Sequence, residues 1–177
     1  MMDITTENKG TISLGSKVMV SDPCYGLGTW CQGVLENVLA GQYDCNVEYS
    51  DEGDWGIRVS AIEVTHIDYD RCTLDEELEK FDVGVDSGQA GIFDYDYYAK
   101  YHMDSTERPH VDDDWYDRVC DLTHTDRCDG NTIDNFGLVS STGFGDGGYD
   151  CWTCRNENGN IVSIRVEFID EYEEEDE

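Results

Sequence analysis

Six polar residues beside predicted turns are the binding-site candidates in this chain. They are Asp22, Tyr25, Asp86, Ser87, Gln89 and Asp94. Carboxylates that converge from separate turns can bind a hard cation such as Ca²⁺ or Mg²⁺, or form part of a small-molecule site. The sequence contains no EF-hand loop or other dedicated cation motif, and aspartate is itself a common turn former. We therefore treat the six residues as binding candidates and assign no catalytic residue.

The most suggestive short motif is Val-Asp-Ser-Gly at residues 85–88. Aspartic proteases carry an Asp-Ser/Thr-Gly triplet after an apolar strand, and two such aspartates share one proton. This chain has a single triplet of that kind, and the Gln-Ala-Gly-Ile continuation does not match the protease pattern well. We interpret residues 85–88 as a structural hairpin turn or a ligand-facing turn, and a hydrolytic module around Asp22 and Asp86 stays an alternative.

Four of the eight cysteines are weak zinc candidates: Cys120, Cys128, Cys151 and Cys154. The last two have the Cys-x-x-Cys spacing of a zinc half-site, and tetrahedral zinc needs four N or S ligands. Residues 149–154 are typical of a strand, however, and residues three apart on a strand face opposite sides. The first two lack the close spacing of a second half-site, although His124 could substitute as a ligand. We expect no cofactor, and we expect free thiols in a reducing compartment.

Negative charge dominates the composition, with 41 Asp and Glu against 11 Lys and Arg and a net charge of −30. Such a surface repels phosphate backbones and anionic lipids, so we expect no direct binding of nucleic acid or membrane. Three interpretations remain: a solvated surface without a dedicated partner, adaptation to high salt, or a binder of basic protein surfaces, including a mimic of nucleic acid. The sequence leaves all three open.

The first 20 residues lack the basic and apolar regions of a secretory signal, and no apolar run approaches the roughly 20 residues that span a bilayer. We therefore predict a soluble, cytoplasmic protein. Its oligomeric state is not predicted.

Alternating apolar residues predict a mainly β (α+β) fold, an antiparallel meander or sandwich-like sheet with about two short helices. The clearest hairpin pairs residues 42–50 with residues 56–66. Further strands are expected over residues 11–20, 81–85, 90–93, 136–141, 149–154 and 161–169. Residues 81–94 would be two strands joined by a tight turn.

The expected helical segments are fewer. We expect residues 30–40 to form a short helix or turn and residues 74–80 to form an exposed helical turn. Residues 95–111 are expected to form a loop. A helix would begin at residues 112–114, with Trp115, Val119 and Leu122 forming one apolar stripe. We expect a polar lead-in at 1–10, one domain at 11–169 and an acidic flexible tail at 170–177.

Four segments occur in an order that resembles small uncharacterised proteins of phages and bacteria. They are Ser-Asp-Pro-Cys-Tyr at 21–25, Trp-Gly-Ile-Arg at 55–58, the block at 84–94, and Gly-Asp-Gly-Gly-Tyr at 145–149. The resemblance covers roughly residues 10–170 and implies a phage or prophage origin, without an activity to transfer. With the net charge, it leads us to expect a non-enzymatic interaction protein whose partner is a basic host protein.

Overall fold

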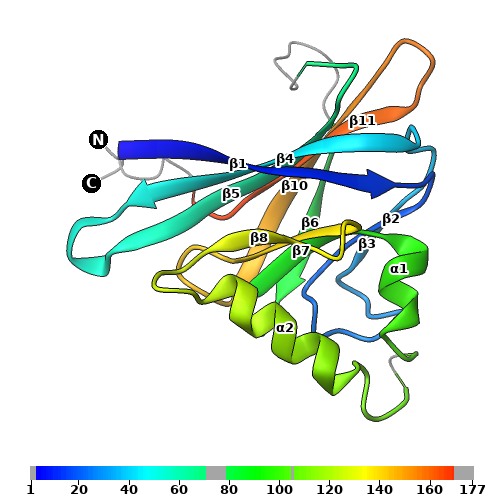
Figure 1. Ribbon diagram of the computed structural model, residues 1–177. Helices are drawn as coiled ribbons and strands as arrows, with labels where there is room; N and C mark the ends of the chain where they lie inside the picture. The colour runs from blue at the N-terminus through cyan, green and yellow to red at the C-terminus, as the bar shows by residue number, and fades with distance from the viewer. Residues whose placement is uncertain (1–2, 71–78, 105, 170–177) are drawn as a thin grey trace.

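The computed structural model describes residues 3–70, 79–104 and 106–169, which form two antiparallel sheets and two α-helices (Figure 1). In chain order the elements are β1 (Asp3–Leu14), β2 (Val18–Ser21), β3 (Gly33–Leu35), β4 (Gly41–Asp51), η1 (Gly53–Trp55), β5 (Ile57–His66), β6 (Glu79–Val85), β7 (Gln89–Asp94), α1 (Tyr95–Lys100), α2 (Asp113–Thr123), β8 (Gly130–Ile133), β9 (Gly137–Ser141), β10 (Gly147–Arg155) and β11 (Ile161–Glu167). The predicted fold class is confirmed.

A six-stranded sheet, in the order β1-β4-β5-β11-β10-β6, forms one layer. The predicted hairpin is its β4–β5 pair, and the predicted alternation holds because Tyr43, Cys45, Val47 and Tyr49 are all buried. A five-stranded sheet, in the order β3-β2-β7-β9-β8, packs against this buried face. The main hydrophobic core lies between the two sheets.

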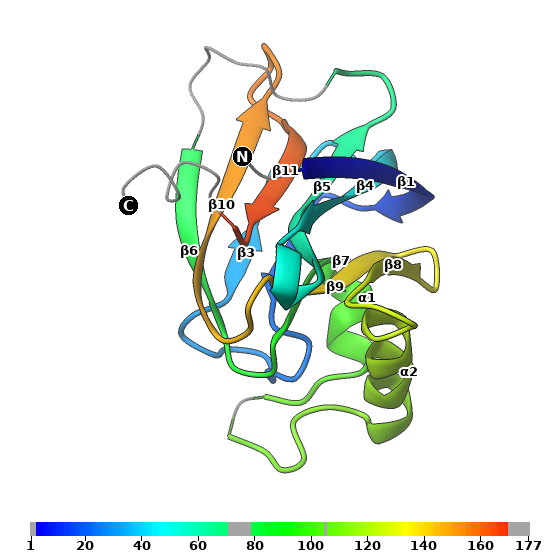
Figure 2. The same cartoon turned by 90° about the vertical axis from the view of Figure 1, so that its left-hand side faces the viewer.

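The five-stranded sheet is covered on both faces, because α1 and α2 pack on its other side (Figure 2). A second core fills this layer, in which Phe93 of β7 contacts Trp115 of α2, with Val119 in the same cluster. Burial on both faces explains why residues 90–93 form a continuous apolar run rather than an alternating one. The predicted helix begins as expected, with the Asp112 carboxylate accepting a hydrogen bond from Trp115 N.

Two predicted strand arrangements are wrong because the chain changes sheet at a glycine. The strand expected at residues 11–20 is divided between β1 and β2, which belong to different sheets, and Gly15 N in the break donates to Asp94 Oδ2 at 2.8 Å. β6 and β7 likewise do not form a hairpin, because β6 pairs with β10 whereas β7 pairs with β2 and β9. The turn at residues 86–88, with Gly88 at φ +74°, joins the two layers instead.

Other local predictions also need correction. Residues 3–10 are the first part of β1 and pair with β4, although they were expected to be a polar lead-in. Residues 30–40 contain β3, which pairs with β2, rather than a helix. The Phe81 ring packs against Gly33 so closely that a Cβ atom at this position would collide with the ring. α1 occupies a segment expected to be loop, and β8 a segment for which no strand was expected. Of the helical turn expected at 74–80, residues 74–78 lie outside the described residues, and residues 79–80 begin β6.

In the described part of the chain, neither helix has the length and apolar composition needed to cross a bilayer.

Candidate functional site

Asp22 is a fully buried carboxylate just after β2, and it binds the turn between β6 and β7. Its Oδ2 atom accepts hydrogen bonds from Asp86 N at 2.8 Å and Ser87 N at 2.7 Å. Its Oδ1 atom accepts from Cys24 N at 2.9 Å and from the Ser87 hydroxyl at 2.7 Å. We call Asp22, Cys24, Asp86 and Ser87 the Asp22 clasp, because these four bonds join the end of β2 to the connection between the sheets.

A chain of polar side chains continues from the clasp to helix α2. Gln89 Oε1 lies 3.0 Å from the Ser87 hydroxyl and accepts a hydrogen bond from the Tyr116 hydroxyl at 2.6 Å. Gln89 Nε2 donates to the Thr123 hydroxyl at 2.9 Å. Gln89 therefore uses both ends of its amide to connect the turn with two residues on one face of the helix, seven positions apart. Burial raises the pKa of Tyr116 to about 12, so its phenol is neutral at physiological pH.

Tyr98 and His102 of the α1 region hold the loop that follows the clasp. The Tyr98 hydroxyl donates to Tyr25 O at 2.6 Å, and the His102 ring stacks on Tyr98 with centroids 3.5 Å apart. The two ring nitrogens of His102 lie 2.7 Å from Pro23 O and 2.6 Å from Tyr98 O. Burial lowers the pKa of His102, although both carbonyls favour its charged form. Sequence analysis did not place His102 in the binding-site set, but the i, i+4 spacing of Tyr98 and His102 was a usable signal.

The chemistry available to the Asp22 carboxylate is limited by its own hydrogen bonds. A carboxylate has about four lone-pair sites, and the clasp occupies all four in good geometry. The neighbouring Cys24 thiol is not activated, because burial and the Asp22 charge raise its pKa to about 12. Asp86, in contrast, is exposed. The pKa of Tyr25 is raised chiefly by burial, and also by hydrogen bonds with Cys31 and Asp86. The four hydrogen bonds fix the backbone and leave Asp22 without a free lone pair to act as a base.

The clasp contains three of the six predicted binding candidates, and Gln89 and Tyr25 adjoin it, whereas Asp94 lies apart. Asp94 caps helix α1 instead, accepting from Tyr97 N at 3.1 Å and Gly15 N at 2.8 Å. The zinc candidates are also separated in the fold: Cys151 is buried in the core between the sheets, whereas Cys120 lies on α2 beside Gln89. Within the ranges that the structure describes, no three His, Cys, Asp or Glu side chains gather as a metal ion would require.

Residues 17–166 match a family described as "Protein of unknown function (DUF4241)". The chain belongs to the DUF4241 family. No curated protein and no solved structure matches it. The match includes the Asp22 clasp, the Gln89 network and both helices, and it leaves out the whole of β1. The clasp is thus part of the DUF4241 region itself.

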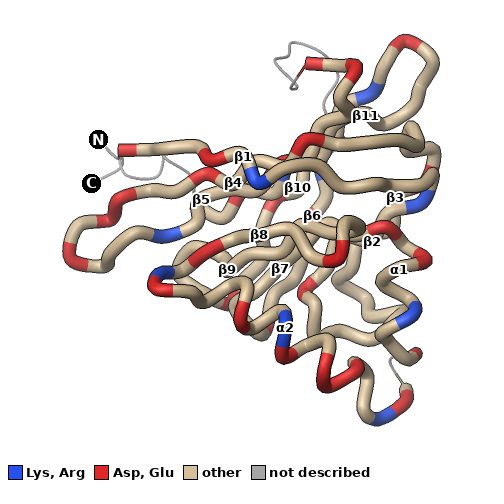
Figure 3. The backbone as a smooth tube through the Cα atoms, viewed as in Figure 1, with Lys and Arg blue, Asp and Glu red and all other residues tan. Residues whose placement is uncertain are grey.

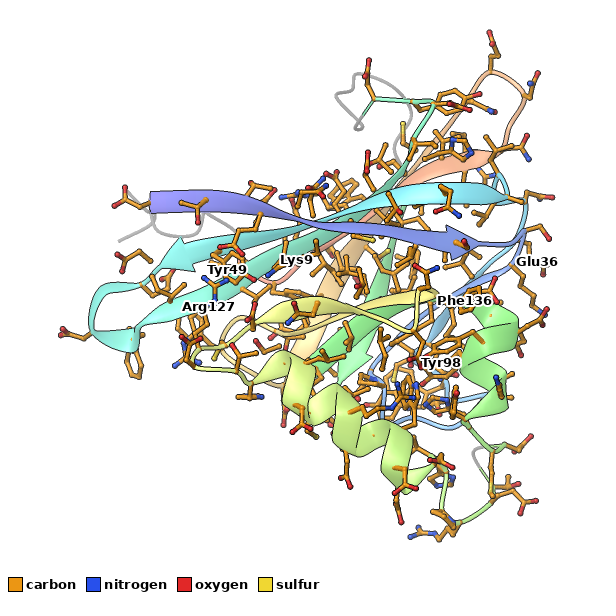
Figure 4. All side chains as sticks on the ribbon, viewed as in Figure 1. Lys9, Glu36, Tyr49, Tyr98, Arg127 and Phe136 are labelled. Atoms are coloured by element: carbon orange, nitrogen blue, oxygen red, sulfur yellow. The ribbon has the colours of Figure 1, made fainter. Side chains whose placement is uncertain are left out.

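This DUF4241 chain also contains a partly buried cluster of mixed charge that sequence analysis missed. Asp129, before β8, accepts hydrogen bonds from the Tyr49 hydroxyl and from Gly130 N. Lys9 Nζ and Arg127 Nη2 each lie 3.6 Å from Asp129 Oδ1, and the Arg127 guanidinium stacks 3.9 Å from the centroid of the Tyr49 ring. Figure 4 shows Lys9, Tyr49 and Arg127 converging from β1, β4 and the loop before β8.

Glu7 completes this group, accepting from Lys9 at 3.1 Å and Arg127 at 2.9 Å. We call Glu7, Lys9, Tyr49, Arg127 and Asp129 the Asp129 cluster. Its members are up to 122 positions apart, 129 minus 7, and no sequence pattern connects them. Only the tertiary structure could have revealed the cluster.

Proposed function

We propose that this DUF4241 protein is a non-enzymatic interaction protein of phage origin that engages a basic surface on a host protein. The observation that carries the proposal is the outer face of α2. Asp113, Asp117 and Asp121 are exposed on this helix at successive four-residue steps, about 6 Å apart along its axis. The resemblance of four segments to segments of phage proteins supports the origin.

The charge of this face is almost uncompensated. Arg118 is the one basic residue of α2, and its Nη1 atom is already paired with Asp134 at 2.6 Å. Figure 3 shows acidic positions along α2 and at the tip of the β4–β5 hairpin. Regularly spaced carboxylates on an outward-facing helix suit a row of lysines or arginines on a partner, and complementary charge would accelerate association.

The alternative, a small-molecule or metal-binding module around Asp22 and Asp86, has one supporting observation. The clasp does bring the two residues together, and the Asp86 carboxylate is exposed. The Asp22 oxygens, however, already accept four hydrogen bonds from the protein itself. A metal ligand or general base needs a free lone pair, so we favour the interaction function.

The proposal is tested by affinity capture from host lysate at about 0.1 M and about 0.3 M salt, with mass spectrometry to identify what is retained. We expect one basic protein to remain at the higher salt. The triple variant Asp113→Asn, Asp117→Asn, Asp121→Asn should lose it. A matched triple variant, Glu36→Gln, Asp68→Asn, Asp70→Asn, changes the net charge equally at other exposed sites and should retain it.

Two results would contradict the proposal. Capture that disappears at the higher salt without a preferred target would indicate nonspecific attraction. Equal loss in the two triple variants would show that net charge, rather than the α2 face, determines binding.

A further inference from the structure

Two exposed aromatic rings meet where the β4–β5 hairpin approaches the β9–β10 loop. Trp55, in η1 at the hairpin tip, is 68% exposed, and Phe144, in the loop, is 55% exposed. Their centroids are 6.3 Å apart with the planes at 84°, an edge-to-face geometry. The rings come from segments 89 positions apart in the sequence, 144 minus 55, so their pairing is a product of the fold.

Arg58 holds this pair in place from the adjoining strand β5. Its Nε donates to Trp55 O at 3.0 Å, and its guanidinium lies 5.3 Å from the centroid of the Phe144 ring. Its Nη1 is 3.5 Å from Gly143 O. Among the described residues Arg58 forms no ion pair with a carboxylate, although the chain has 41 acidic residues. We call Trp55, Arg58 and Phe144 the aromatic anchor.

The surroundings of the aromatic anchor are acidic. Asp51 and Asp54 on the hairpin and Asp146 on the loop are all exposed. The anchor also adjoins the segment that follows α2, because Arg58 Nη1 lies 4.0 Å from Cys128 Sγ. An apolar centre with a charged rim, built from Trp, Arg and Phe, has the composition of a protein-binding hot spot.

We propose that the aromatic anchor receives a large apolar side chain from a basic protein segment, whose lysines and arginines face Asp51, Asp54 and Asp146. The inference rests on the proposed function and names where such a partner would be held. Nucleic acid and anionic membranes are poor occupants, since the acidic rim repels phosphate. A second copy is also disfavoured, because each chain carries −30.

The test uses two synthetic peptides of lysine and arginine, one with a central leucine and one with serine in its place. The native protein should bind the leucine peptide about tenfold more tightly at about 0.1 M salt, by fluorescence anisotropy of labelled peptide. Trp55→Ala and Phe144→Ala should reduce this preference to about twofold or less and leave the serine peptide unaffected. Trp30→Ala is the matched control, since Trp30 is 92% exposed elsewhere, and it should retain the full preference.

The outcomes separate the two proposals. Failure of both peptides to bind would overturn the basic-surface function and the anchor with it. Equal binding of both peptides by the native protein would overturn the anchor alone, as would a leucine preference that survives in Trp55→Ala. Sedimentation showing dimers that Trp55→Ala dissociates would assign the anchor to a second copy instead and overturn the proposal. Unchanged urea midpoints would confirm that the variants are folded.

Discussion

Asp22 and Asp129 are both buried carboxylates in a protein of net charge −30, and they are stabilised in different ways. Asp22 accepts from three backbone N–H groups and one hydroxyl, and within the described residues no basic side chain forms an ion pair with it. Asp129 has two cations, Lys9 and Arg127, within 3.6 Å. Asp22 is stabilised by oriented dipoles alone, whereas Asp129 has nearby cations in addition to its hydrogen bonds.

The difference between Asp22 and Asp129 shows how a chain with only 11 lysines and arginines can bury acidic groups. Backbone N–H groups are available in every turn, so a dipole-based site consumes none of the scarce cations. The two sites also relate differently to the DUF4241 match. The Asp22 clasp lies wholly within residues 17–166, whereas Glu7 and Lys9 of the Asp129 cluster precede it.

The largest expected effect is that of Asp22→Ala on stability. The substitution leaves the N–H groups of Cys24, Asp86 and Ser87 without their acceptor, and buried unsatisfied donors are costly. We expect the free energy of unfolding to fall by about 3 kcal/mol in urea titrations. The exposed-site control Asp117→Ala should change it by less than about 0.5 kcal/mol. Equal losses in the two variants would show that the clasp has no special structural role.

Arg127→Met should have a smaller effect that depends on salt. Arg127 contacts Glu7, Asp129 and the Tyr49 ring, but its side chain is 32% exposed and therefore partly screened. We expect a loss of about 1 kcal/mol at low ionic strength, which shrinks as the Debye length falls to about 3 Å near 1 M salt.

The comparison with Asp22→Ala is made at each salt concentration. The loss of unfolding free energy caused by Asp22→Ala should stay nearly constant with salt, because neutral dipoles rather than cations stabilise Asp22. Arg108→Met, at an exposed site, controls for the change in net charge. A salt-dependent loss for Asp22→Ala and a constant one for Arg127→Met would reverse the assignment of the two mechanisms.

A third effect should appear on acidification. Hydrogen bonds from Lys9 and Arg127 lower the pKa of Glu7. Burial raises the pKa of Asp129, but hydrogen bonds from Tyr49 and other donors lower it more, so its net shift is also downward. A depressed folded-state pKa contributes stability that is present above the unfolded value of about 4 and is lost as the pH falls through the folded value.

Arg127→Met should therefore flatten the dependence of unfolding free energy on pH below about 4. Urea titrations at a series of acidic pH values measure this slope for both proteins. Groups outside the cluster, such as Asp134 with Arg118, contribute equally to both and cancel. Parallel pH profiles would mean that the Asp129 cluster does not couple protonation to folding.

What the sequence could reveal about the fold depends on whether the deciding contacts are local or distant along the chain. The alternation at residues 42–50 predicted β4 correctly, and the Asp112 cap with its apolar stripe predicted α2. Both signals lie within one element. The sheet to which β6 and β7 belong depends instead on distant partners, β10 and β2. The two strands and the turn between them were therefore predicted correctly, but the hairpin alternative for this turn was wrong.

The candidate site follows the same rule. Turn chemistry at Asp22 and at residues 86–89 was visible, and the structure joins these residues. Their hydrogen-bond partners on α2 were not visible, because Tyr116 and Thr123 are 27 and 34 positions from Gln89. The aromatic anchor and the Asp129 cluster likewise depend on register between distant strands and loops, which a single sequence does not encode locally.

The smallest expected effect is a change in the reactivity of Cys24, which reports directly on the unpaired charge of Asp22. With a pKa of about 12, roughly one Cys24 thiol in ten thousand is ionised at pH 8, and only the thiolate reacts. Asp22→Asn removes the charge and should lower this pKa, so that iodoacetamide modifies Cys24 several-fold faster.

Cys151, fully buried in the core, is the internal control. If Cys151 stays unmodified while Cys24 accelerates, the effect is local electrostatics; if both accelerate together, the variant has merely opened. An unchanged Cys24 rate in a folded variant would show that the N–H dipoles fully screen the Asp22 charge from the thiol. Asp22 would then be neutralised as completely as Asp129 is by Lys9 and Arg127, and the two sites would differ in geometry alone.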